Sequence, residues 1–152
     1  MQSLSRSRLF VYTPDMKQRG GSMISIVGAS LVALAVLFFG VRLIGQERAK
    51  ARDSQRVADM ARLQVGFLLL FNRTSSFAPA AVNGCDVVKK PVRTCSLSQD
   101  LPSIATFRDP RGGDYLVTKV PDATTYQISF TLEQGTTGLA KGAHVLTPEG
   151  IR

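Results

Sequence analysis

The sequence has no tryptophan, one histidine and two cysteines in 152 residues. Cys85 and Cys95 with the distant His144 do not supply the four ligands of a standard structural zinc site. The glycines match no phosphate-binding loop, and His144 has no carboxylate or nucleophile near it in the sequence, so we read it as a structural residue. We therefore expect no enzymatic activity and no cofactor.

One run could in principle hold a cation. Asp109-Pro-Arg-Gly-Gly-Asp114 offers the carboxylates of Asp109 and Asp114 and nearby carbonyl oxygens, which are ligands that calcium accepts. Asp, Pro and Gly are also the residues that turns require. We expect a turn that leads into a strand at Tyr115, with calcium as the weaker alternative.

Proline is absent between Pro14 and Pro79, and charge is absent from residue 20 to residue 41. The first absence permits a single helix over about residues 21–72, which at ~1.5 Å per residue would be ~75 Å long. The second leaves ~22 uncharged residues, enough to cross a hydrocarbon core of ~30 Å. We expect residues 21–44 to be the membrane-embedded half of this helix.

The formal net charge of +8 is concentrated around the apolar run. Residues 1–20 carry a net charge of +3, and five cations lie between Arg42 and Arg56 against two acids. Anionic lipid headgroups account for this distribution as well as nucleic acid would, and we do not expect DNA as a partner. Because four cations precede the run and five follow it, the positive-inside rule does not orient it.

The even cysteine count indicates the compartment. Cys85 and Cys95 lie ten residues apart in residues 73–110, a long irregular connection that also holds four of the seven prolines. A disulfide would stabilise such a loop by roughly 2–3 kcal/mol. Disulfides persist in oxidising compartments. We expect a disulfide, and a single-pass protein of the cytoplasmic membrane whose C-terminal domain lies outside the cytoplasm.

Residues 45–72 have helical periodicity. Five apolar side chains fall within a ~100° arc: Val57, Met60, Ala61, Leu68 and Phe71. Opposite charges recur three residues apart in the pairs Glu47/Lys50, Asp53/Arg56 and Asp59/Arg62. Such pairs are typical of a solvated helix face. We expect Asp59 and Arg62 to point away from the apolar arc.

Residues 111–152 predict an antiparallel sheet of about three strands, over residues 115–120, 125–132 and 143–146. The second stretch alternates apolar and polar residues, and the turn at residues 121–124 joins it to the first as a hairpin. One face of such a sheet is apolar and needs a cover. The amphipathic half of the helix would supply it, which gives an α+β fold.

Two glycines stand directly before the apolar run. A secretory signal peptide would have a shorter apolar region with its cleavage site after it. Here Gly20 and Gly21 follow two cations and precede the run, so cleavage there would remove the leader, residues 1–20, and keep the membrane segment. An uncleaved signal anchor is the alternative.

The order of these features resembles bacterial type IV pilins and type II secretion pseudopilins. The nearest local similarity is K-A-R-D-S-Q-R-V-A-D-M-A-R-L-Q at residues 50–64, followed by L-L-F-N at residues 69–72 and S-F-A-P at residues 76–79. The C-terminal runs F-R-D-P at residues 107–110 and G-A-H-V-L-T-P-E-G at residues 142–150 are similar too. Each motif is weak alone, but together they extend over most of residues 17–151.

The resemblance implies a prepilin. A membrane peptidase would cut after Gly20 or Gly21, and the new terminus, Gly21 or Ser22, would be N-methylated. The resemblance also implies partners: the prepilin peptidase, an inner-membrane assembly platform, membrane lipid before assembly, and other pilin subunits in a periplasmic or cell-surface filament. Secretion, adhesion, motility and DNA uptake all use such subunits.

The sequence departs from the family pattern at the fifth position. The family usually has glutamate there, whereas this chain has Ser25 or Ile26, depending on the cleavage site. Members without that glutamate are often minor subunits, so the resemblance allows this chain to be either a major or a minor subunit of the filament. The competing hypotheses are a signal-anchored monomer with an extracytoplasmic binding domain and a membrane-tethered enzyme, for which the sequence offers no residues.

Overall fold

The computed structural model describes residues 23–152, with side chains from residue 27 onward. The chain divides into two compact units, Met1–Phe39 and Gly40–Arg152. Helix α1 (Met23–Thr74) contributes residues to both units, and the other described elements belong to the second. The predicted leader, residues 1–20, lies outside the described residues.

Helix α1 ends two residues beyond the predicted position. Ser75 has a φ of 54°, a left-handed conformation that stops a helix, and its N–H donates to the carbonyl of Phe71 at 2.6 Å. The hydroxyl of Thr74 donates to the carbonyl of Leu70 at 2.9 Å. The last turn of α1 is therefore closed by its own residues, before the next element begins at Ala78.

The buried face of α1 in the second unit matches the predicted arc only in part. Met60 is buried and Val57 and Phe71 pack against the core, but Ala61 and Leu68 are exposed. Arg62 is exposed, as predicted, whereas Asp59 is buried rather than turned to water.

The buried stripe of α1 has alternating spacings of four and three residues, and Asp59 and Gly66 are buried beside it. Its members are Ala49, Asp53, Arg56, Met60, Leu63, Phe67 and Leu70. The predicted arc was misplaced because charged residues occupy two positions of this stripe, which hydropathy assigns to the surface.

The sheet has four antiparallel strands in the order β1-β2-β3-β4, one more than predicted. They are β1 (Leu116–Lys119), β2 (Gln127–Leu132), β3 (Gly142–Thr147) and β4 (Gly150–Ile151). The predicted alternation of β2 is confirmed, since Ile128, Phe130 and Leu132 are buried. Strand β4 is only two residues long, too short for a period of two, and it forms by pairing with the end of β3.

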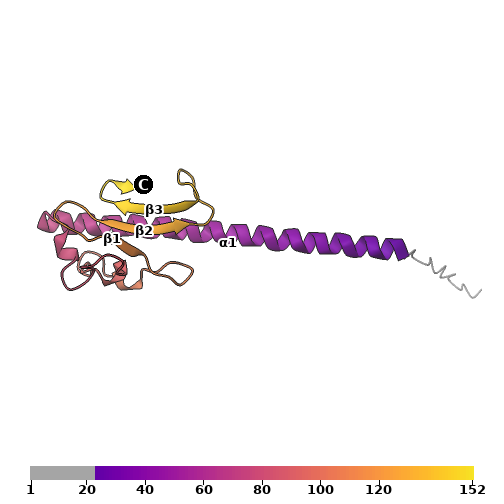
Figure 1. Ribbon diagram of the computed structural model, residues 1–152, viewed down its shortest axis with the longest axis horizontal. Coiled ribbons are helices and arrows are strands. Elements are labelled where there is room, and N and C mark those ends of the chain that lie inside the picture. Colours follow the sequence, from indigo (N-terminus) through magenta and orange to yellow (C-terminus); the bar gives the residue numbers. More distant parts are fainter. Residues whose placement is uncertain (1–22) are drawn as a thin grey trace, which may run out of the picture. The chain divides into compact units, whose positions relative to one another are not determined.

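The second half of α1 covers the apolar face of the sheet, which confirms the α+β fold (Figure 1). At the centre of the core, Phe67 of α1 stacks on Tyr126 with ring centroids 3.9 Å apart. Phe77 meets both rings edge-on, at 6.2 and 5.1 Å. Aromatic clusters of this kind bury large apolar areas, so this contact fixes α1 against β2.

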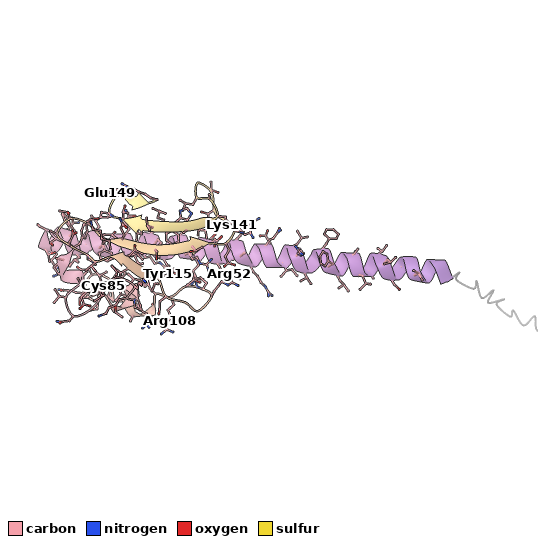
Figure 2. The ribbon with its side chains drawn as sticks, in the orientation of Figure 1. Arg52, Cys85, Arg108, Tyr115, Lys141 and Glu149 are labelled. Carbon is pink, nitrogen blue, oxygen red and sulfur yellow. A yellow bond between two sulfur atoms is a disulfide. The ribbon has the colours of Figure 1, made fainter. Side chains whose placement is uncertain are left out.

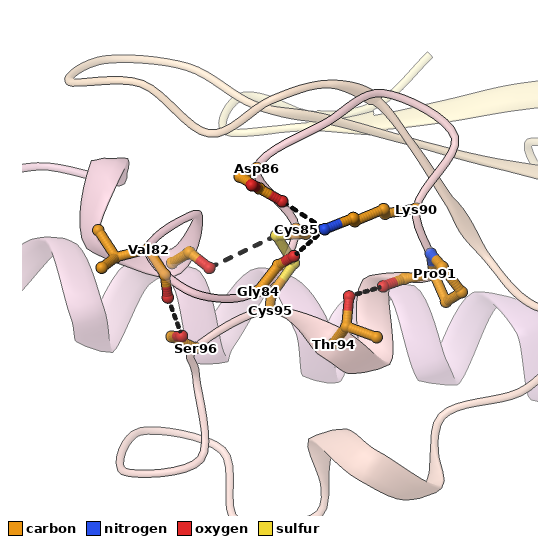
Figure 3. The surroundings of a disulfide bond; sticks show 10 residues. Val82, Gly84, Cys85, Asp86, Lys90, Pro91, Thr94, Cys95 and Ser96 are labelled. Carbon is orange, nitrogen blue, oxygen red and sulfur yellow. Dashed lines mark hydrogen bonds and ion pairs between the residues drawn. A yellow bond between two sulfur atoms is a disulfide. The ribbon is translucent and has the colours of Figure 1, made fainter.

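The connection between α1 and the sheet has three short 3₁₀ helices, η1 (Ala78–Ala80), η2 (Val92–Thr94) and η3 (Ile104–Thr106). Within it, Cys85 and Cys95 form a buried disulfide, as predicted (Figure 3). A Cβ on Gly84 would lie 2.2 Å from the carbonyl oxygen of Thr94. Glycine is therefore required where the two sides of the disulfide loop meet.

Candidate functional site

The first candidate site is the apolar segment of α1, residues 27–44. Its eleven large apolar side chains are each 55–70% exposed. The sequence has no charged residue from residue 20 to residue 41. By length and composition, α1 is the one helix in the described part of the chain that could cross a membrane. Soluble proteins rarely expose an apolar surface of this kind, so it marks a site that lipid or protein covers.

The second candidate site is an apolar ridge on α1 in the second unit, formed by Ala61, Val65, Leu68 and Leu69. The last three side chains are 54%, 53% and 46% exposed. Val65 lines two hollows of about 280 Å³ each. The other residues that line the first hollow are Gln64, Leu68, Phe77, Tyr126 and Pro148. Those that line the second are Ala61, Arg62 and Leu101. Clefts for drug-sized ligands are larger, roughly 300–1,000 Å³, so these hollows suit protein side chains better.

A buried arginine connects α1 to the loops beside the sheet. Arg56 is 2% exposed, and its Nε and Nη2 donate to the two carboxylate oxygens of Asp109 at 2.6 and 2.8 Å. Its Nη1 donates to Asp53 and to Glu133, both at 2.8 Å. Arg52, which is labelled in Figure 2, makes a second two-bond pair with Glu133, at 2.8 and 2.7 Å. We call these five residues the arginine network.

The arginine network stabilises the ionised form of its acids. Burial alone would raise the pKa of Asp53 and of Asp109, but hydrogen bonds from backbone N–H groups and from Arg56 outweigh it and lower both pKa values. Hydrogen bonds from Arg52, and further bonds from Arg56, lower the pKa of Glu133 to about 2. The hydrogen bonds from Arg56, first of all to Asp109, raise the pKa of that guanidinium.

Asp53 also anchors the turn that follows β2. Its carboxylate accepts hydrogen bonds from the backbone N–H groups of Glu133, Gln134 and Gly135 at 2.9, 2.7 and 3.0 Å. The expectation that the Asp53/Arg56 pair faces solvent was therefore wrong, because the partners of both residues come from distant loops. The pair Glu47/Lys50 does face solvent, with its charged atoms 3.1 Å apart.

A neighbouring polar contact accounts for the burial of Asp59. The hydroxyl of Tyr115 donates to its carboxylate at 2.9 Å, and both side chains are buried. Burial raises the pKa of Asp59 and also that of Tyr115. This bond connects the middle of α1 to the residue before β1, so it orients the first strand against the helix.

Asp109 and Asp114, the two acids that could have bound calcium, form ion pairs with arginines instead. Asp109 accepts from Arg56, and Asp114 accepts from Nε of Arg93 at 2.8 Å. The run between them is a turn, in which the N–H of Gly112 donates to the carbonyl of Asp109 at 2.8 Å. Within residues 23–152, no group of three or more His, Cys, Asp or Glu side chains could hold a metal ion.

The residues predicted to direct processing are not described. Gly20, Gly21 and Ser22 lie outside the described residues, and Ser25 lies in α1 before the first described side chain. His144 sits in β3, where its Nε2 bonds the carbonyl oxygen of Ala140 at 2.8 Å and its ring stacks on Phe130.

Comparisons with protein-family models, with curated proteins and with solved structures found no match to this chain.

Proposed function

We propose that this chain is a structural subunit of a filament of the type IV pilus or type II secretion pseudopilus kind. One observation carries the proposal: an exposed apolar segment, with Arg42 near its C-terminal end as its one charged residue, continues within a single helix into the part of that helix that packs in the core of a small α+β domain. A membrane anchor alone would not need this continuity, whereas a subunit that moves from lipid into a filament would keep its apolar segment and its domain as one piece.

The energetics favour a protein cover once the segment leaves the membrane. Fully burying a large apolar side chain is worth about 1.5–3 kcal/mol, so eleven such side chains represent tens of kcal/mol. A subunit extracted from lipid must replace that cover with the apolar segments of neighbouring subunits. The apolar ridge of the second unit offers a further contact surface of the same chemistry.

The processing step gives the proposal a genetic test. Cleavage after Gly20 or Gly21 would release the basic leader and leave the apolar segment at the new terminus. We expect replacement of both glycines by leucine to block processing. Normal processing of this variant would show that the site assignment is wrong.

Assembly can be measured by cross-linking, because the only two cysteines in the sequence are joined in the disulfide. A single cysteine in the apolar segment, Leu34→Cys, should form intermolecular disulfides in filaments or in membranes where subunits cluster. Lys141→Cys, on an exposed loop residue, is the matched control. Equal and low cross-linking at both positions would contradict assembly through the apolar segment.

A second candidate function, a signal-anchored binding domain, is favoured by one feature. A cleft of about 370 Å³ has Arg56, Asp109 and Glu133 of the arginine network among its lining residues, together with Arg111 and Tyr115. Such a protein would remain a full-length monomer in the membrane. The cross-linking experiment separates it from a filament subunit.

A further inference from the structure

Strand β1 is at one edge of the sheet, and a segment of the disulfide loop covers that edge. The N–H of Lys89 donates to the carbonyl of Val117 at 2.7 Å, and the N–H of Val117 donates to the carbonyl of Lys90 at 2.9 Å. The N–H of Val92 donates to the carbonyl of Tyr115 at 2.8 Å. The outward N–H and carbonyl of Val117, and the carbonyl of Tyr115 just before β1, are thus paired with residues 89–92, which we call the edge cover.

The edge cover pairs with β1 but is not itself a regular strand. Lys89 has a φ of 68°, and Pro91, which bridges to Leu116, has no N–H to offer. The 3₁₀ helix η2 begins directly after Pro91. A segment with these features ends the sheet, because it cannot serve as a template for another strand.

The disulfide closes the loop that contains the edge cover. Cys85 and Cys95 lie on either side of residues 89–92 and are 0% and 4% exposed (Figure 3). The bond reduces the number of conformations open to the detached loop, so it favours the paired one. Without it, the edge cover would still be held by its three backbone bonds and by the burial of Val92. Bonds from Nζ of Lys90 to Asp86 and to the carbonyl of Gly84, and the bond from Arg93 to Asp114, would remain too.

We propose that the Cys85–Cys95 disulfide guards the edge of β1 against pairing with a second copy of this chain. An uncovered β1 is self-complementary. Val117 directs both its N–H and its carbonyl outward, so two copies related by a two-fold axis can exchange both hydrogen bonds at this residue in an antiparallel pair. Leu116 and Thr118, on either side, are exposed and uncharged, and the one charge on β1 is that of the exposed Lys119 at its end.

The oxidation state of the chain therefore controls an interaction surface. A protein disulfide of the oxidising compartment accepts two electrons and two protons from the thiols of Cys85 and Cys95 and becomes a dithiol. The Cys85–Cys95 disulfide that forms keeps the edge cover paired with β1. A dithiol reductant reverses the step: it is oxidised to its cyclic disulfide, and both cysteines regain their protons. Premature edge pairing would thus be confined to chains that have not yet been oxidised.

The test compares the oxidised full-length chain with a Cys85→Ser/Cys95→Ser variant, both in detergent micelles. We expect amide hydrogen exchange at Lys89 to be roughly 100-fold faster in the variant, the factor that closing a loop of this length represents. Exchange at Val117 stays slow in the dimer, because its N–H there bonds a second copy instead of Lys90. We also expect a dimer of the variant in sedimentation. Adding Leu116→Lys, which places a charge on the exposed edge, should abolish that dimer.

A second variant keeps the disulfide and disturbs only the edge cover. Lys89→Pro removes the N–H that bonds Val117, and proline cannot adopt the φ of Lys89. The Lys89→Pro variant should dimerise through β1, and adding Leu116→Lys should again abolish the dimer. If the cysteine-free chain fails to fold, as judged by near-ultraviolet circular dichroism of the buried tyrosines, the Lys89→Pro variant decides. Slow exchange at Lys89 without the disulfide, or a dimer that persists with Leu116→Lys, would overturn the proposal.

Discussion

Between residues 27 and 44, helix α1 exposes eleven large apolar side chains, whereas between residues 49 and 70 it buries the charged side chains of Asp53 and Arg56. Both stretches therefore depart from the usual pattern, in which apolar side chains are buried and charged side chains are exposed. The charged stretch is covered by loops of its own chain, which supply hydrogen-bonding partners. Among the described residues, nothing covers the apolar stretch in this way, and the proposed function therefore concerns what covers it.

The largest expected difference in unfolding free energy is between two ion pairs of α1 that have the same i,i+3 spacing, Asp53/Arg56 and Glu47/Lys50. Arg56→Ala leaves three carboxylates without their buried partner and should cost about 3–5 kcal/mol of unfolding free energy. Lys50→Ala removes an exposed partner of Glu47 and should cost at most ~0.5 kcal/mol. Urea unfolding of the detergent-solubilised chain, followed by near-ultraviolet circular dichroism, measures both. Similar costs would mean that the arginine network does not hold the domain together.

A second comparison tests the corrected face of α1. Leu63 is 0% exposed and Leu68 is 53% exposed, although they lie only five residues apart. Leu63→Ala should cost about 2–5 kcal/mol of unfolding free energy, because it leaves a cavity in the core. Leu68→Ala should stay within ~0.5 kcal/mol. If Leu68→Ala were as costly as Leu63→Ala, the ridge would belong to the core rather than to an interaction surface.

The third and smaller effect is acid sensitivity of the charged stretch. Glu133 has a pKa of about 2 in the folded chain against its usual 4.5, so its contribution to stability is complete above pH 4.5 and is lost as the pH falls toward 2. Asp53 and Asp109 also have lowered pKa values and act in the same direction. Asp59 has a raised pKa and opposes them.

Urea midpoints measured at several values between pH 6 and pH 3 should therefore decrease toward the acid end. Glu133→Gln should flatten this dependence, because its amide does not titrate in this range. An unchanged slope in that variant would assign the acid sensitivity to other groups.

Much of the fold could be predicted from local pattern. The missing prolines permitted one helix, the alternation in β2 identified its buried face, and the spacing of Cys85 and Cys95 indicated the disulfide. These features depend on residues that are near one another in the sequence. Strand β4 could not be predicted, since a two-residue strand exists only through its partner.

The arginine network could not be predicted because its partners are far apart in the sequence. Asp109 and Glu133 lie 53 and 77 residues from Arg56. The run Arg52-Asp53-Ser-Gln-Arg56 was visible, but its i,i+3 spacing is the same as that of an exposed pair such as Glu47/Lys50. Only the fold shows that a loop donates three backbone N–H groups to Asp53 and thereby makes its burial favourable.

The central claim is that the apolar stretch belongs to a processed filament subunit rather than to a permanent anchor. The intact mass of the protein extracted from membranes tests it most directly. We predict a chain that lacks residues 1–20 or 1–21 and carries one added methyl group at its new terminus. A chain that still begins at Met1 would contradict the account.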